Sequence, residues 1–172
     1  MGHPPAGPGS LTIAGSGVSD RVHYLVPDPA TQAYIRQRYL CTNDLAKYYR
    51  ENQSRYKSYI DMSEVILRDV RAGYKVVAII NGHPGSTASP AHRALEIARW
   101  ESYQVQMLPA ISPQDCMIAD LGIDPSMYGC MISEAAELLA HERSLNTLVH
   151  NIILNIGGIG ERPLMSTLHY LD

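Results

Sequence analysis

Short apolar runs that end in glycine or proline recur along the chain and predict β-strands. The run at 11–14 stops at Gly15-Ser16-Gly17, and the run at 22–26 stops at Pro27-Asp28-Pro29. The run at 75–80, KVVAII, is mostly β-branched, which is typical of a strand covered on both faces. Further strands are expected at 104–108, 130–132 and 148–156.

Helical spacing occupies the intervals between these runs. The clearest helix begins near Ser54 and ends before Gly73, a residue suited to a C-cap. Its apolar residues recur three and four positions apart, at Tyr59, Met62, Ile66 and Val70. Ser89-Pro90 and Ser112-Pro113 each supply an N-cap followed by a proline that suits the first turn of a helix. The remaining helices are expected at 30–38, 89–100, 112–122 and 134–141.

Strands that alternate with helices predict an α/β fold, with a mostly parallel sheet and helices on both faces. In such sheets ligands bind at the carboxyl ends of the strands. Three glycine-containing loops follow strands here, at 15–17, 82–85 and 157–160. Gly15-Ser16-Gly17 has no third glycine at the dinucleotide spacing, so a Rossmann-type nucleotide site is not expected.

Composition narrows the classes of partner. The chain has 172 residues, of which 45% are hydrophobic and 18% charged, as expected for one globular domain. A formal charge of −3 disfavours nucleic acid as a partner, and no apolar run reaches the roughly 18 residues that a membrane span needs. Residues 1–9 are expected to be a flexible leader.

Cysteine and histidine spacing argues against disulfides and metal. Cys41, Cys116 and Cys130 are odd in number and lack a C-x-x-C pair, which favours a reducing cytoplasm and disfavours a cysteine zinc site. The seven histidines never form an H-x-x-x-H pattern, so no metal site is expected. The chain also lacks a G-x-S-x-G elbow, which disfavours the usual hydrolase chemistry.

The segment 48–59 holds the densest set of reactive side chains. With a helix that starts near Ser54, Arg55 and Tyr59 form an i,i+4 pair, and Tyr49 comes from the preceding turn. A guanidinium beside phenols lowers the phenol pKa and creates a base. The alternative is a solvated amphipathic segment without chemistry. His83, in the loop 82–85, has the corresponding alternative of a purely structural histidine.

Five blocks in family order resemble the tetrapyrrole methylase superfamily of S-adenosylmethionine-dependent methyltransferases. Within it they are most similar to the borosin peptide backbone N-methyltransferases. The blocks are GSLTIAGSGV (9–18), DPATQAYI (28–35), YYRENQSRYKSYIDMSE (48–64), NGHPGSTASPAHRALEIA (81–98) and MLPAISPQDCMIADLGIDPSMYGC (107–130).

The resemblance implies a homodimer that binds S-adenosylmethionine, methylates backbone amides of a peptide and releases S-adenosylhomocysteine. The peptide is supplied either in cis, as the tail of the same chain, or in trans. The catalytic residues of the family correspond to Tyr49, Arg55 and Tyr59, with either tyrosine as base and Arg55 as charge stabiliser. The cofactor contacts correspond to Asn81, His83, Ser86, Ser112, Pro113 and Asn155.

The chain departs from the family pattern at three places. Asn81 stands where the peptide methylases have tyrosine, and the segment between Gly17 and Asp20 is shorter than the family's helix. The second α/β domain is expected to be largely missing, with 10–160 as the cofactor-binding domain and 161–172 as a remnant of a second-domain strand. Two other functions stay open: a shortened SAM-binding or dimerisation module without turnover, and a methyltransferase for a tetrapyrrole or another small metabolite.

Overall fold

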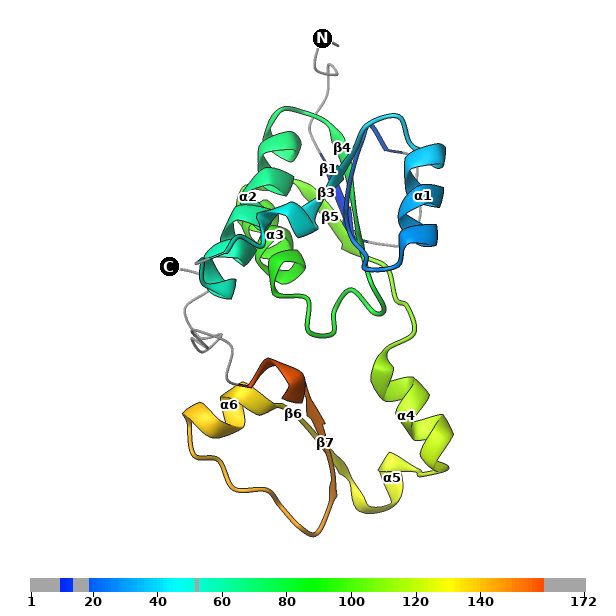
Figure 1. The fold of residues 1–172 in the computed structure, drawn as a ribbon, viewed down its shortest axis with the longest axis vertical. Coiled ribbons are helices and arrows are strands. Elements are labelled where there is room, and N and C mark those ends of the chain that lie inside the picture. The colour runs from blue at the N-terminus through cyan, green and yellow to red at the C-terminus, as the bar shows by residue number, and fades with distance from the viewer. Residues whose placement is uncertain (1–9, 14–18, 52, 160–172) are drawn as a thin grey trace. The chain divides into compact units, whose positions relative to one another are not determined.

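The computed structural model describes residues 10–13, 19–51 and 53–159 and divides the chain into two compact units, 1–110 and 111–172 (Figure 1). The expected leader at 1–9, the loop 15–17 and the expected remnant at 161–172 lie outside the described residues. Within the described part, no helix has the length and apolar character needed to cross a membrane.

The first unit contains a five-stranded sheet in which every pairing is parallel. The strands lie in the order β3-β2-β4-β1-β5. Their bounds are β1 Ser10–Ile13, β2 Arg21–Leu25, β3 Thr42–Asp44, β4 Lys75–Ile80 and β5 Gln104–Met107. The prediction of a mostly parallel sheet is therefore confirmed, and the predicted bounds of the strand at 75–80 are those of β4.

Strand β4 lies at the centre of the sheet because its side chains are apolar on both faces. On one face, Val77 and Ile79 pack with β2 and with α1 (Pro29–Arg38). On the other face, Val76 and Ala78 belong to the core under α2 (Arg55–Arg71) and α3 (Ser89–Trp100). Burial on both faces explains the unbroken apolar run and confirms that helices cover both sides of the sheet.

Helix α2 forms as the sequence pattern predicts. The Ser54 hydroxyl accepts a hydrogen bond from Lys57 N and caps the first turn. The apolar face is fully buried at Met62, Ile66 and Val70. After the C-cap residue Ala72, Gly73 adopts a φ of +86°, a conformation that favours glycine.

Two local predictions differ from the structure. Ser89 is the first residue of α3 and not its cap, because the Ala88 carbonyl already accepts from Ala91 N and His92 N at 2.9 and 3.2 Å. Strand β3 and the following 3₁₀ turn η1 (Leu45–Tyr48) were not expected in the polar segment after Cys41. They are too short to show a periodic pattern, and pairing with β2 creates the strand.

The second unit pairs two parallel strands in a separate sheet. Its elements are α4 Pro113–Leu121, α5 Pro125–Tyr128, β6 Cys130–Glu134, α6 Ala135–Ala140, β7 His150–Leu154 and the 3₁₀ turn η2 Ile156–Gly158. Ser112 caps α4 through a capping box with Asp115, and Gly122 ends that helix at φ +62°, as predicted. Among the described side chains of this unit, Ala135 and Ile152 are the buried hydrophobic ones.

Candidate functional site at the carboxyl edge of the sheet

The carboxyl ends of the five parallel strands share one edge of the sheet, the position where open α/β proteins bind ligands. Helix α2 leads into the start of β4 and α3 follows its end, so both helices have their N-termini at this edge. The turn η1 also begins there, directly after β3. The topology thus brings the segment around Tyr49, the first turn of α2 and the loop 81–88 to the same edge.

The loop after β4 selects the tautomer of the neutral His83 ring. The Gly85 N–H donates to His83 Nδ1 at 3.0 Å, so Nδ1 acts as an acceptor. In the neutral ring the proton must then reside on Nε2, which becomes a hydrogen-bond donor. His83 is half-buried, and Ser86 N donates to its carbonyl at 2.9 Å, which closes the turn.

Gly85 lies in a confined part of this loop. A Cβ at this position would lie 3.0 Å from the Met107 sulfur and 3.1 Å from His83 Cε1. The Gly85 carbonyl accepts a hydrogen bond from His92 Nε2 on α3 at 2.9 Å. The sequence analysis did not identify His92 as a residue of this site. The signal that could have found it is its position in the first turns of a helix that follows a glycine-containing loop.

The structure brings two of the three predicted catalytic residues into contact. The rings of Tyr49 and Tyr59 meet edge to face, with centroids 6.1 Å apart and planes at 76°. Tyr49 follows η1 and is 45% exposed, whereas Tyr59 is half-buried and packs against the core of the first unit. Arg55 is the exposed first residue of α2, one turn before Tyr59 and on the same face of the helix.

The six predicted cofactor residues are divided between the two units. Asn81, His83 and Ser86 follow β4 in the first unit, where Asn81 is exposed and its N–H donates to the Leu25 carbonyl at 3.1 Å. The second unit contains the others, Ser112, Pro113 and Asn155. Ser112 and Pro113 start α4, and Asn155 adopts a left-handed φ of +57° at the end of β7.

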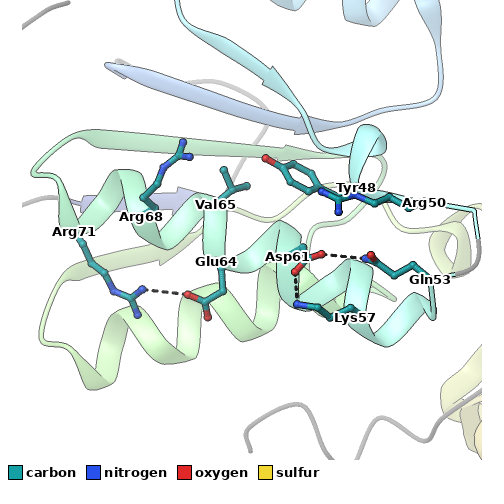
Figure 2. A pocket seen from close by; sticks show the side chains of 9 residues that line it. All are labelled: Tyr48, Arg50, Gln53, Lys57, Asp61, Glu64, Val65, Arg68 and Arg71. Carbon is teal, nitrogen blue, oxygen red and sulfur yellow. Dashed lines mark hydrogen bonds and ion pairs between the residues drawn. The ribbon is translucent and has the colours of Figure 1, made fainter.

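A groove runs along α2 (Figure 2). The helical spacing of its residues puts it on the face opposite to that of Arg55 and Tyr59. Its volume is about 690 Å³. The residues that line it are Tyr48, Arg50, Gln53, Lys57, Asp61, Glu64, Val65, Arg68 and Arg71. Sequence reasoning missed it, because a charged stripe on a helix has the same pattern as a solvated surface.

Both carboxylates in the groove are held in the ionised form. Hydrogen bonds from Lys57 and Gln53 hold the pKa of Asp61 below its ordinary value. Burial alone would raise the pKa of Glu64, but hydrogen bonds from Arg93 and Arg71 outweigh burial, and this pKa is also lowered. Asp61 and Glu64 are therefore charged at neutral pH.

Comparison with known proteins yields a family match. Residues 2–157 match the family model of Tetrapyrrole (Corrin/Porphyrin) Methylases. A methyltransferase/ribosomally synthesized type I borosin cyclic peptide precursor of Mycena rosella is 49% identical over 170 residues, which cover 89% of this chain and 43% of that protein.

Two further relatives carry similar names. A type I borosin precursor of Gymnopilus junonius is 45% identical, with 91% of this chain and 41% of that protein covered. A type III borosin precursor of Anomoporia bombycina is 43% identical, with 89% of this chain and 20% of that protein covered. The chain therefore spans less than half the length of these relatives.

Proposed function

This chain belongs to the tetrapyrrole (corrin/porphyrin) methylase family, and on that basis we propose that it is an S-adenosylmethionine-dependent methyltransferase that N-methylates backbone amides of a peptide. The methyltransferase and borosin cyclic peptide names of its relatives support this proposal. The observation that carries it in the structure is the contact between Tyr49 and Tyr59, on the same edge as the loop after β4.

The residues at the carboxyl edge fit S-adenosylmethionine, whose carboxylate, amine and ribose hydroxyls all need polar partners. His83 holds an Nε2–H donor, Asn81 exposes an amide that both donates and accepts, and Ser86 adds a hydroxyl. We assign these three side chains as cofactor contacts, and in the second unit Ser112, Pro113 and Asn155. When bound, the cofactor supplies an electrophilic methyl group and leaves as S-adenosylhomocysteine.

Methylation of an amide requires removal of its proton, because the nitrogen lone pair is delocalised into the carbonyl. In our proposal Tyr49 or Tyr59, as a phenolate, accepts the proton from the amide nitrogen. Arg55 stabilises the negative charge that develops on the imidate oxygen. The edge-to-face contact holds the two phenols close together, and Arg55 is one helical turn away from Tyr59.

We also propose that the protein is a homodimer. Exposed apolar side chains in the second unit support this part of the proposal. Large hydrophobic side chains on α4, α5 and β6 are exposed, among them Leu121, Met127 and Ile132. A two-stranded sheet is marginally stable without further packing, so these side chains favour a protein partner. The same observation favours the second candidate function, an assembly module without turnover.

Two further parts of the proposal concern substrate class and location. Asn81, in place of the tyrosine of the peptide methylases, is the residue that favours a small metabolite as alternative substrate. The cysteines Cys41, Cys116 and Cys130 are free thiols, which supports a reducing cytoplasm as the place of action.

The test combines binding with product analysis. The purified chain is titrated with S-adenosylhomocysteine in a calorimeter and then incubated with S-adenosylmethionine and candidate peptides. We expect saturable binding and peptide products heavier by one methyl group each, with the methyl on backbone nitrogen. A folded chain that shows neither heat nor a rise in melting temperature at saturating ligand contradicts the enzyme and leaves the assembly module as the better account.

A further inference from the structure

The groove along α2 has a surplus of hydrogen-bond donors. Its carboxylate oxygens are already used: Asp61 accepts from Lys57 at 2.6 Å and from Gln53 at 3.0 Å. Glu64 accepts from Arg71 at 3.2 Å and from Arg93 at 2.6 Å. An incoming ligand therefore meets few vacant acceptors on these two side chains.

The cations of the groove keep donors available. The side chain of Arg50 makes no hydrogen bond or ion pair with a described residue, although its charge helps to lower the pKa of Asp61. Arg68 directs Nε and one terminal nitrogen to a single oxygen of Asp69, at 3.0 and 2.9 Å, which leaves its other terminal nitrogen. Lys57 uses one of its three N–H groups on Asp61. The lining holds four cations and two carboxylates. With the ion-pair partners just outside it, Asp69, Arg93 and Glu101, five cations face four carboxylates, which leaves a formal excess of one positive charge.

The shape of the groove suits an extended chain. Its α2 residues run along one helical face from Lys57 to Arg71, a distance of about 21 Å at the helical rise. About six residues of extended peptide span that length. In Figure 2, Tyr48 and Val65 lie between the guanidinium groups of Arg50 and Arg68, so the lining is apolar in its middle and cationic around it.

The groove is adjacent in the chain to the proposed catalytic residues. Tyr48 and Arg50, which line it, flank Tyr49 directly. Arg55 and Tyr59 are on the opposite face of the same helix. A peptide held in the groove would therefore contact the sequence neighbours of Tyr49, and its adjoining segment would have to pass around α2 to reach Arg55 and Tyr59.

We infer that this groove binds an extended, acidic segment of the peptide substrate, outside the segment that is methylated. The inference rests on the proposed function, because it names a docking segment of the same substrate. Carboxylate side chains match the donor surplus and the net positive charge. An apolar side chain on the same face of the extended segment, two residues from a carboxylate, matches Val65 and the ring of Tyr48.

The test uses a fluorescein-labelled octapeptide of alternating Glu and Ser, in which Val replaces one central Glu, and a second octapeptide with Gln in place of every Glu. Fluorescence anisotropy measures the binding of both to the full chain. We expect the Glu peptide to bind at least fivefold more tightly than the Gln peptide, which is about the effect of two or more exposed ion pairs. The affinity of the Glu peptide should fall as the salt concentration is raised. Equal affinity for the two peptides would overturn the inference.

Arg50→Glu is the test variant, because the Arg50 side chain has no hydrogen-bond or ion-pair partner among the described residues. Arg99→Glu is the matched control, an exposed arginine on α3 with the same change of charge. We expect that Arg50→Glu, and not Arg99→Glu, lowers the affinity for the Glu peptide by about fivefold. An equal effect of both variants, or of neither, contradicts a groove-specific site.

Titration of the same samples with S-adenosylhomocysteine separates the two proposals. If the chain binds the cofactor but does not prefer the Glu peptide, the groove is not an acidic-peptide site, and the proposed function still stands. Peptide preference without cofactor binding rejects the proposed function, and with it the assignment of the bound segment to a methylation substrate.

Discussion

His23 donates a hydrogen bond from Nε2 to Oδ2 of Asp69 across 3.1 Å and so ties β2 to α2 inside the first unit. His23 is 1% exposed and Asp69 is 9% exposed. The other ring nitrogen, Nδ1, accepts from the Asn43 amide at 2.9 Å, and Asn43 in turn accepts from Lys47. Both ring nitrogens are thus satisfied, which a buried polar side chain requires.

We expect Asp69→Ala to destabilise the protein by about 2–3 kcal/mol, because it leaves the buried His23 N–H without an acceptor. Asp69→Asn, which retains a side-chain oxygen of the same shape, should cost clearly less. Urea unfolding at pH 7, followed by circular dichroism, measures both. If Asp69→Ala and wild type unfold at the same urea concentration, the pair contributes nothing to stability.

Stability should fall as the pH drops below about 4. Burial raises the pKa of Asp69, but the hydrogen bonds from His23 and Arg68 outweigh it, so the folded-state pKa lies below the ordinary value of about 3.9. A lowered carboxyl pKa gives stability that is present above the unfolded-state pKa and is lost as pH falls through the folded-state value.

Urea midpoints at pH 7, 5, 4 and 3 measure this loss. Asp61 and Glu101 have lowered pKa values through hydrogen bonds from Lys57 and Arg71, so they contribute with the same sign. Asp69→Asn should show a shallower decline between pH 4 and pH 3 than wild type. Parallel declines would exclude Asp69 as a source of the acid sensitivity.

Tyr59→Phe should lower the rate of peptide methylation by about 10²–10⁴-fold if Tyr59 is the base. The ring contact with Tyr49 does not need the hydroxyl, so folding and affinity for S-adenosylhomocysteine should be unchanged. Tyr34→Phe, on the exposed surface of α1, is the control. Mass spectrometry of the peptide product gives the rates, and undiminished methylation by Tyr59→Phe would leave Tyr49 as the candidate base.

His92→Ala should weaken binding of S-adenosylhomocysteine by about threefold to tenfold, the effect of one hydrogen bond. The bond from His92 Nε2 to the Gly85 carbonyl fixes the loop that orients His83. His92→Gln supplies a side-chain N–H and should restore part of the affinity. Calorimetric titration measures all three proteins, and an alanine variant with wild-type affinity would remove His92 from the positioning of this loop.

Ile132→Lys should convert the expected dimer into a monomer. Ile132 is 52% exposed on β6, and a lysine there would have to be desolvated at an interface. Leu40→Lys, at a fully exposed position of the first unit, is the control and should remain dimeric. Light scattering after gel filtration reports the mass, and a monomeric wild type would contradict the dimer itself.

Sequence predicts the parts of this fold whose signal is local and periodic. The apolar run of β4 and the spacing of Met62, Ile66 and Val70 specified both elements, because burial of a whole face repeats regularly in sequence. The three-residue strand β3 carries no such period and exists through pairing with β2. The cap of α3 depends on the backbone conformation of Ala88, with φ −112° and ψ 60°, which residue type alone does not reveal.

The same distinction between local and long-range signals applies to the polar contacts of the first unit. The i,i+4 relation of Arg55 and Tyr59 follows from helical geometry. The sequence also placed Tyr49 on the turn before this helix, and its ring meets that of Tyr59. The buried pair of His23 and Asp69 joins elements far apart in the chain. A histidine inside an apolar strand and an aspartate on the apolar face of a helix were its only local traces.

The strand order has a consequence for the time course of folding. Strand β1 has no partner among its sequence neighbours: Ser10 pairs with Lys75 of β4 and with Gln104 of β5. Contacts between distant parts of a chain close large loops and slow folding. During synthesis, β1 leaves the ribosome before β4 and β5 and cannot pair until they have followed, so Leu11 and Ile13 have no sheet partner until then.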